Sequence, residues 1–171
     1  IFFFEAIRLT SCKYPSDRAL RITFFKGLNN YFFIYNKRRK AMHISVKTNA
    51  RTQMIDITSK VQTAVKESGI KNGLVHVFSM HTTAAVTINE NADPAVEADI
   101  LNTINKVIPW DDHFKHMEGN SAAHIKVSLF GPSEIIPLEN GSFVLGTWQG
   151  IYFCEFDGPR NRRVNIKIIP G

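Results

Sequence analysis

The chain has 171 residues, of which 44% are apolar, and a formal net charge of +6. This length suits one domain with a substantial core. The positive charge would favour a nucleic-acid or membrane partner, but nine of the Lys and Arg residues lie in residues 1–41, against two acidic residues. Residues 42–171 hold twelve Lys and Arg and thirteen acidic residues, a net charge of −1. We therefore expect no nucleic-acid or membrane partner for that part.

Residues 1–41 concentrate Phe and Tyr without a sustained helical or alternating period. Their apolar runs are too short to span a bilayer, and the order of charged and apolar segments does not fit a secretory signal. We interpret residues 1–41 as an N-terminal extension or translated leader, with a basic, aromatic arm on a membrane surface as the alternative. The working domain would then be residues 42–171.

The cysteine content gives no disulfide framework, because the chain has only Cys12 and Cys154. Cys154 lies in a strand-like run, where a small buried residue is the simplest interpretation. Together with the missing targeting pattern, this predicts a cytoplasmic protein.

Strand and helix patterns follow each other from residue 42 onward. Alternating or short apolar runs predict strands at 43–48, 52–57, 74–79, 84–89, 135–138, 143–145, 150–156 and 163–169. The strand at 74–79 is predicted to be buried, and residues 139–142 predict a hairpin between the strands at 135–138 and 143–145. Helices are predicted after three N-cap signals, which are Thr58 or Ser59, Asp93 followed by Pro94, and Asn120 or Ser121. Eight strands and three helices in this order predict an α+β fold with a mainly antiparallel sheet.

The stretch HTTAAVTINENADP, residues 81–94, holds an alternating strand with polar groups at both ends. One end carries His81 and Thr82, and the other carries Asn89, Glu90, Asn91 and Asp93. A strand that only packs has no need of so many polar side chains, so the stretch indicates a functional site. For Asp93 the simpler role is the helix cap; for Glu90 the sharper role is acid/base chemistry or Mg²⁺ binding.

Three histidines from separate elements, His81, His116 and His124, could form a metal site. No short spacing such as HExxH is present, so the zinc pattern is weak, and separate hydrogen-bonded histidines remain the alternative. We predict that the three converge on one metal ion or phosphate, with Glu90 near enough to act on a bound water or a substrate proton. His113 lies close enough in sequence to take the place of His116.

Two further segments have possible binding roles. GTWQG, residues 146–150, places two glycines around Trp148 and Gln149 within strand sequence, where a glycine indicates a bend or a close approach. Arg160, Arg162 and Arg163 could hold a phosphate, although a solvated turn is the more common structure for such a run.

Three blocks of this sequence resemble the YjbQ family, also called secondary thiamine-phosphate synthases. They are HTTAAVTINENADP, EGNSAAHIKVSLFG and GTWQGIYFCEF, in the order and spacing of that family within residues 42–171. The resemblance implies a compact α+β subunit, a homotrimer and a histidine-lined pocket that holds a metal or an anion. It implies a weak activity that joins hydroxymethylpyrimidine diphosphate to thiazole phosphate and releases pyrophosphate. The matched positions are His81, Glu90, Asp93, His124, Trp148 and Gln149.

These observations give one set of expected roles. Catalysis is assigned to His81, Glu90 and Asp93, and metal binding to His81, His116 and His124 with a divalent ion, Zn²⁺ or Mg²⁺. Binding of a small phosphorylated substrate is assigned to Thr82, Asn89, Asn91, Trp148 and Gln149. The sequence has no Walker-type loop and no DDxxD-like cluster for a diphosphate–metal complex. A metal-dependent hydrolase of a small phosphorylated substrate and a non-catalytic metal- or ligand-binding protein therefore remain as alternatives.

Overall fold

A computed structural model describes the backbone of residues 21–27 and 30–36 and the whole of residues 42–171. The chain divides into two units, residues 1–40 and 41–171, which are described separately. In the first unit, β1 (Arg21–Gly27) and β2 (Asn30–Asn36) pair antiparallel. Because residues 1–41 have no sustained helical or alternating period, no helix or strand was predicted there. The β propensity of Phe, Tyr and Ile favours these two strands. Cys12 lies outside the described residues.

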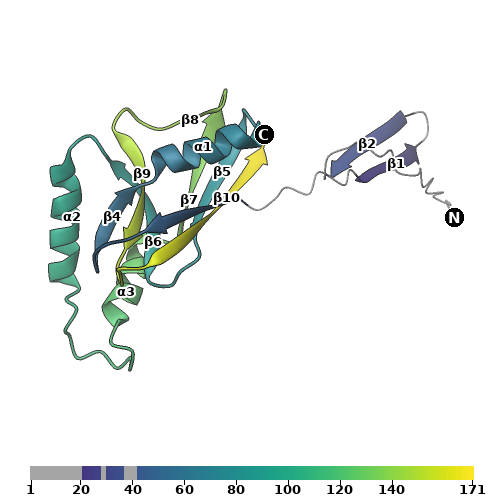
Figure 1. Cartoon of the computed structure of the whole chain (residues 1–171). Helices are drawn as coiled ribbons and strands as arrows, with labels where there is room; N and C mark the ends of the chain where they lie inside the picture. The colour runs from purple at the N-terminus through teal and green to yellow at the C-terminus, as the bar shows by residue number, and fades with distance from the viewer. Residues whose placement is uncertain (1–20, 28–29, 37–41) are drawn as a thin grey trace. The chain divides into compact units, whose positions relative to one another are not determined.

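The second unit contains eight strands and three helices, which confirms the predicted α+β class (Figure 1). Its first half consists of β3 (Met42–Lys47), β4 (Gln53–Asp56), α1 (Thr58–Ser68), β5 (Gly73–Ser79), β6 (Ala84–Glu90) and α2 (Pro94–Val107). Its second half consists of α3 (Ser121–Phe130), β7 (Ser133–Glu139), β8 (Ser142–Phe143), β9 (Gln149–Glu155) and β10 (Asn161–Pro170).

The eight strands form two antiparallel sheets instead of one. The larger sheet has the order β3-β10-β5-β7-β8, and the smaller has the order β4-β9-β6. β3 and β4 follow each other in sequence but lie in different sheets. The polar segment between them, residues 48–52, therefore carries the chain from one layer to the other.

Two cores lie on the two faces of the smaller sheet, because its side chains alternate. Ile151 and Phe153 of β9 point into a core shared with the larger sheet and closed by α1. Tyr152 and Cys154 point into a second core, against the half-buried apolar side chains of α2 and the buried ones of α3. β9 is therefore buried on both faces, and the buried position expected for Cys154 is confirmed. Burial in this apolar environment raises the pKa of the Cys154 thiol.

Three local predictions differ from the structure. The N-cap position of α1 is Ile57 and not Thr58 or Ser59, because the Asp56 carboxylate accepts hydrogen bonds from both the backbone N–H and the hydroxyl of Thr58. β5 is buried on one face only. β8 has two residues, although the hairpin before it forms as predicted, with positive φ at Asn140 and Gly141.

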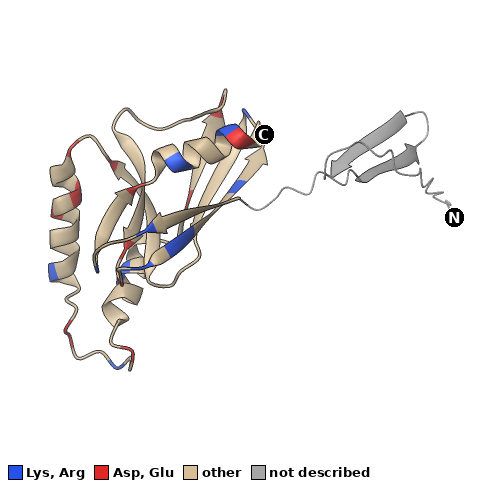
Figure 2. Ribbon diagram, in the orientation of Figure 1, with Lys and Arg blue, Asp and Glu red and all other residues tan. Residues whose placement is uncertain are grey.

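The helix start at Asp93 and Pro94 is confirmed. The Asp93 carboxylate accepts a hydrogen bond of 2.8 Å from the Ala95 N–H, and Pro94 occupies the first turn. Figure 2 shows acidic and basic residues interspersed along the second unit, which fits its small net charge. Within residues 42–171 and the two β-strands before them, no helix is long and apolar enough to cross a bilayer.

Candidate functional site

A cavity of about 610 Å³ lies between the end of β5, the turn into β6, and α3. Its polar lining comes from His81, Thr82, His124, Ser79 and Ser128, and its apolar lining from Phe78, Met80, Val127 and Pro132. Two of the three predicted histidines therefore share one cavity, together with Thr82. We refer to this cavity as the histidine pocket.

His81 is held in one orientation by the neighbouring strand β10. Its Nε2 accepts a hydrogen bond of 2.9 Å from the backbone N–H of Arg163. In a neutral imidazole one nitrogen accepts and the other carries the proton, so Nδ1 of His81 is the donor in this arrangement. His81 thus offers an N–H group to a ligand, which suits an anionic oxygen better than a metal ion.

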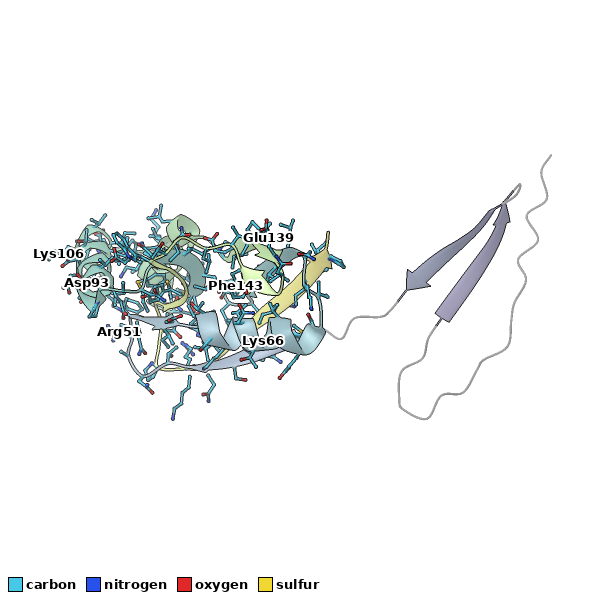
Figure 3. The ribbon with its side chains drawn as sticks, turned by 90° about the horizontal axis from the view of Figure 1, so that it is seen from above. Arg51, Lys66, Asp93, Lys106, Glu139 and Phe143 are labelled. Atoms are coloured by element: carbon cyan, nitrogen blue, oxygen red, sulfur yellow. The ribbon has the colours of Figure 1, made fainter. Side chains whose placement is uncertain are left out.

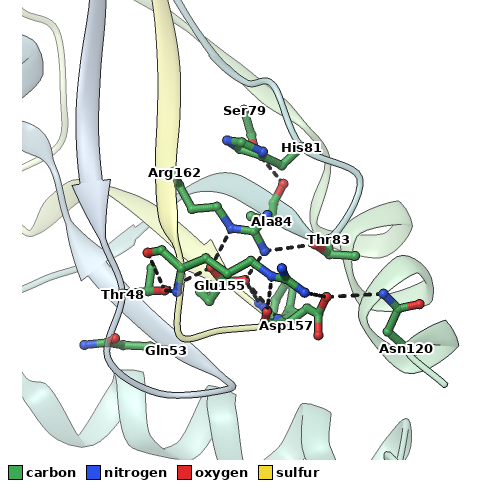
Figure 4. Close-up of polar contacts among 12 residues, drawn as sticks. Thr48, Gln53, Ser79, His81, Thr83, Ala84, Asn120, Glu155, Asp157 and Arg162 are labelled. Carbon is green, nitrogen blue, oxygen red and sulfur yellow. Dashed lines mark hydrogen bonds and ion pairs between the residues drawn. The ribbon is translucent and has the colours of Figure 1, made fainter. Parts of the chain in front are cut away.

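A buried ion pair lies beside His81 (Figure 4). Arg162 donates from Nε and NH2 to the two carboxylate oxygens of Glu155, at 2.7 and 2.6 Å. The same NH2 group donates to the Thr83 hydroxyl at 2.9 Å, and Thr48 donates to Glu155 at 3.1 Å. Glu155 is fully buried, so this pair is a fixed part of the structure beside His81.

The environment of His81 lowers the pKa of its imidazole below the usual value of 6.5. Partial burial is the largest cause, and the nearby Arg162 guanidinium acts in the same direction, whereas Glu155 opposes it. The neutral form of His81 is therefore favoured, which agrees with the accepting role of Nε2.

Stability should fall with acid in a way that depends on His81. Between the lowered folded-state pKa and 6.5 the unfolded chain binds more protons, so this group destabilises the fold as the pH falls through 6.5. Urea unfolding from about pH 7.5 to about pH 5.5 should show a smaller loss of unfolding free energy for His81→Gln than for the unaltered chain. Equal losses in the two proteins would contradict the role given to His81; His76→Gln is the control.

His116 and His124 form the other histidine pair. Their rings meet edge to face with centroids 5.5 Å apart, and His116 Nε2 lies 3.7 Å from a Glu118 carboxylate oxygen. His116, and not the alternative His113, is thus the histidine beside His124. Nowhere in the described part of the chain do three His, Cys, Asp or Glu side chains come close enough to hold a metal ion. With Nε2 of His81 already engaged, the residues of one chain do not fit the predicted three-histidine metal site.

The remaining predicted site residues lie at the opposite end of β6. This strand has seven residues, and at about 3.3 Å each its ends are about 20 Å apart. Glu90 pairs with Gln149 in the sheet, and Asn91 donates from its side chain to the Asp56 carboxylate at 3.2 Å. Asn89, Asp93 and Trp148 belong to the same end.

Several side chains at this far end are already engaged in local hydrogen bonds. Gln149 Oε1 accepts from the Gly146 N–H at 2.7 Å, which fixes the loop, and Asp93 caps α2. A Cβ atom on Gly150 would overlap the side chain of Asn91, so this glycine permits the close approach that the sequence indicated. Within one chain, Glu90 is thus too far from His81 and His124 to act on the same ligand.

The arginine run after Gly158 divides between an exposed turn and a buried ion pair. Arg162 is buried against Glu155, and Arg160 forms an ion pair of 2.7 Å with Asp157. The solvated turn is therefore confirmed for Arg160 and wrong for Arg162, whose guanidinium is engaged by Glu155. Glu155 was not singled out from the sequence, although a carboxylate in the apolar run 151–156 requires an opposite charge.

Comparison with known proteins identifies the family. Residues 42–171 match the family model described as UPF0047 protein YjbQ-like. The chain belongs to the YjbQ family. The UPF0047 protein YugU of Bacillus subtilis is 51% identical over 127 residues, which are 74% of this chain and 96% of the relative. A UPF0047 protein of Methanocaldococcus jannaschii is 52% identical over 124 residues, 72% of this chain and 90% of the relative.

Solved structures of YjbQ-family proteins have the same fold. A crystal structure of an uncharacterized YjbQ/UPF0047 protein from Clostridium acetobutylicum has a TM-score of 0.74 and 58% identity, covering 75% of this chain and 99% of that one. A protein of unknown function from Sulfolobus solfataricus gives a TM-score of 0.74 at 34% identity, covering 77% and 97%. The family's fold is therefore secure for residues 42–171.

Proposed function

We propose that the histidine pocket binds the diphosphate-bearing substrate of a thiamine-phosphate-synthase-like transferase. The observation that carries the proposal is that His81 and His124 line one cavity of about 610 Å³ with both hydroxyl and apolar walls. This volume lies within the usual range for pockets that bind small molecules.

The two kinds of lining suit the two parts of such a substrate. Nδ1–H of His81 and the hydroxyls of Thr82 and Ser128 are donors for phosphate oxygens. Phe78 and Met80 offer apolar surface to a heterocyclic ring. A phosphorylated heterocycle therefore uses both, whereas a bare metal ion would use neither the apolar wall nor the N–H group of His81.

The proposed reaction needs little covalent chemistry from the protein. The C–O bond to the diphosphate breaks, pyrophosphate leaves with the bonding electrons, and a lone pair of the thiazole nitrogen forms the new C–N bond. Hydrogen bonds from His81 and His124 would stabilise the charge that develops on the leaving group, and the apolar walls would hold the two rings together. A divalent ion enters this proposal as the counter-ion of the diphosphate rather than as a three-histidine centre.

Glu90, Asn91 and Trp148 enter the proposed site from a neighbouring subunit. Support comes from the outer face of the larger sheet, where Leu74 and Phe78 of β5 are exposed beside two other apolar residues, Ile135 and Ile169. Phe78 also lines the histidine pocket, so a second copy of the chain on this face would lie next to the pocket. A closed homotrimer would cover the face and let one subunit complete the site of another.

Light scattering tests the proposed trimer. We expect a trimer at micromolar concentration, and we expect Ile135→Lys to shift it toward monomer, because a charge on a buried apolar interface is costly. Thr63→Lys, on the exposed side of α1 and away from the outer face of the larger sheet, is the control and should leave the mass unchanged. A monomer in the unaltered protein would contradict this part of the proposal.

Turnover separates the proposed transferase from the other functions. The purified full chain is incubated with hydroxymethylpyrimidine diphosphate, thiazole phosphate and Mg²⁺, and the products are separated. Formation of thiamine phosphate and pyrophosphate in equal amounts is the expected result. Release of inorganic phosphate without coupling would favour a hydrolase, and binding without any turnover would favour a ligand-binding protein; either outcome overturns the proposal.

A further inference from the structure

A second cavity, of about 320 Å³, lies where the segment between β3 and β4 meets the end of α2 and the opposite side of α3. None of its lining residues lines the histidine pocket. The residues that matter for its chemistry are Arg51, Thr52, Asn105, Trp110, Asp111 and Lys126. We call it the lysine cavity.

Lys126 of α3 is a buried cation without a counter-charge. It is 1% exposed, and its ammonium donates one hydrogen bond of 2.6 Å to Asn105 Oδ1. Within residues 42–171 no carboxylate lies within 4 Å of it, and the bond to Asn105 is the one hydrogen bond that its ammonium makes to these residues. Burial lowers the pKa of Lys126. Burying a charge without a partner is costly, so a ligand that supplied negative charge would be bound favourably.

Arg51 supplies a second cation to the same cavity. Its guanidinium lies over the Trp110 ring, 4.5 Å from the ring centroid, which orients the group while leaving its N–H edges free. Neither a hydrogen bond nor an ion pair engages this side chain in the part of the chain that the structure describes. The edge of a guanidinium can donate two parallel hydrogen bonds to a carboxylate or phosphate.

Asp111 is the one carboxylate in the lining of the cavity, and it is exposed. It forms no ion pair with Lys126 or Arg51 in the described structure, so it does not neutralise either cation. Two cations and one carboxylate leave one net positive charge for a ligand. Thr52 adds a hydroxyl, whose hydrogen bond to Asn105 Oδ1 is long at 3.5 Å.

We propose that the lysine cavity binds a small oxyanion, with Lys126 at its floor and Arg51 at its rim. The ligand class is a compact molecule or group that bears a phosphate or a carboxylate. The proposal does not depend on the function of the histidine pocket, because the two cavities have separate residues. The competing explanation is purely structural: the bond from Lys126 to Asn105 joins α3 to α2.

Tryptophan fluorescence gives a local readout of this cavity. The chain has two Trp residues, so Trp148→Phe leaves Trp110, beneath Arg51, as the only one. In that background, inorganic phosphate and acetate are titrated separately at constant ionic strength with chloride as the blank. We expect a saturable change in Trp110 emission with at least one of them. The anion that binds more tightly identifies the phosphate or the carboxylate as the ligand group.

Substitutions then assign the binding to the two cations. Arg51→Gln is on an exposed residue and should fold normally, and it should weaken binding about tenfold or more, as should Lys126→Met. Lys66→Met on α1, which Figure 3 shows well apart from Arg51, is the matched control and should leave the affinity unchanged. His124→Ala should also leave it unchanged, which separates this site from the histidine pocket. No saturable change with either anion, or equal affinity in Arg51→Gln, would overturn the proposal.

Discussion

Glu155→Gln should lower the unfolding free energy by about 3–5 kcal/mol, the usual loss when one partner of a buried ion pair is removed. Glu155 is fully buried and accepts two hydrogen bonds from Arg162, with others from Thr48 and the backbone of residues 156 and 157. The neutral amide would leave the Arg162 guanidinium buried without an opposite charge. Urea unfolding at neutral pH measures the loss.

An exposed ion pair provides the control for this loss. Arg160 and Asp157 are 2.7 Å apart, but half of the Arg160 side chain is exposed. Arg160→Met should therefore cost no more than about 1 kcal/mol. Replacing both Glu155 and Arg162 with apolar residues should recover part of the first loss, because no unpaired charge remains. A loss below about 1 kcal/mol for Glu155→Gln would contradict the importance given to this pair.

Gly73→Ala should lower the unfolding free energy by more than about 2 kcal/mol, from two separate causes. Gly73 begins β5, has a φ of +140° and lies between β10 and β7 in the larger sheet. An L-residue is strained at this φ, and its Cβ atom would overlap the carbonyl oxygen of Ile169. Because the overlapped atom belongs to the backbone of β10, the strand itself has to move.

Gly141→Ala separates these two causes. Gly141 has a φ of +84°, but a Cβ atom there would meet nothing within 4 Å. Its substitution should cost only the backbone strain, about 1–2 kcal/mol. If Gly73→Ala were no worse than Gly141→Ala, the close approach of β10 to Gly73 would not be a real constraint on the sheet.

The fold class was accessible from the sequence because local rules agreed with the tertiary structure. The alternation of residues 84–89 and the pair Asp93-Pro94 predicted β6 and the start of α2 within a residue. The division into two sheets was not accessible, since it depends on which strands pair at long range. The predicted N-cap residue of α1 was also wrong. The carboxylate of Asp56, at the end of β4, accepts hydrogen bonds from the N–H and the hydroxyl of Thr58, so the helix begins at Thr58.

The candidate site was predicted only in part, because the sequence does not show which residues meet at long range. The sequence indicated that His81 and His124 are functional, and the structure brings both to one cavity. It could not show that β6 separates Glu90 from them by about 20 Å, because sequence proximity along a strand is not proximity in space. The Glu155–Arg162 pair spans a turn of five residues, and only its burial distinguishes it from an exposed pair.

Pyrophosphate binding tests the histidine pocket most directly. We expect isothermal titration of the full chain to give a saturable signal, and His81→Ala and His124→Ala each to weaken it by roughly 10–150-fold, the loss of about 1.5–3 kcal/mol from one hydrogen bond to a charged group. His113→Ala, at an exposed histidine that does not line the pocket, is the matched control and should bind as the unaltered protein does. If both pocket variants remain folded and bind pyrophosphate with unchanged affinity, the histidine pocket is not the phosphate site and the proposed function is wrong.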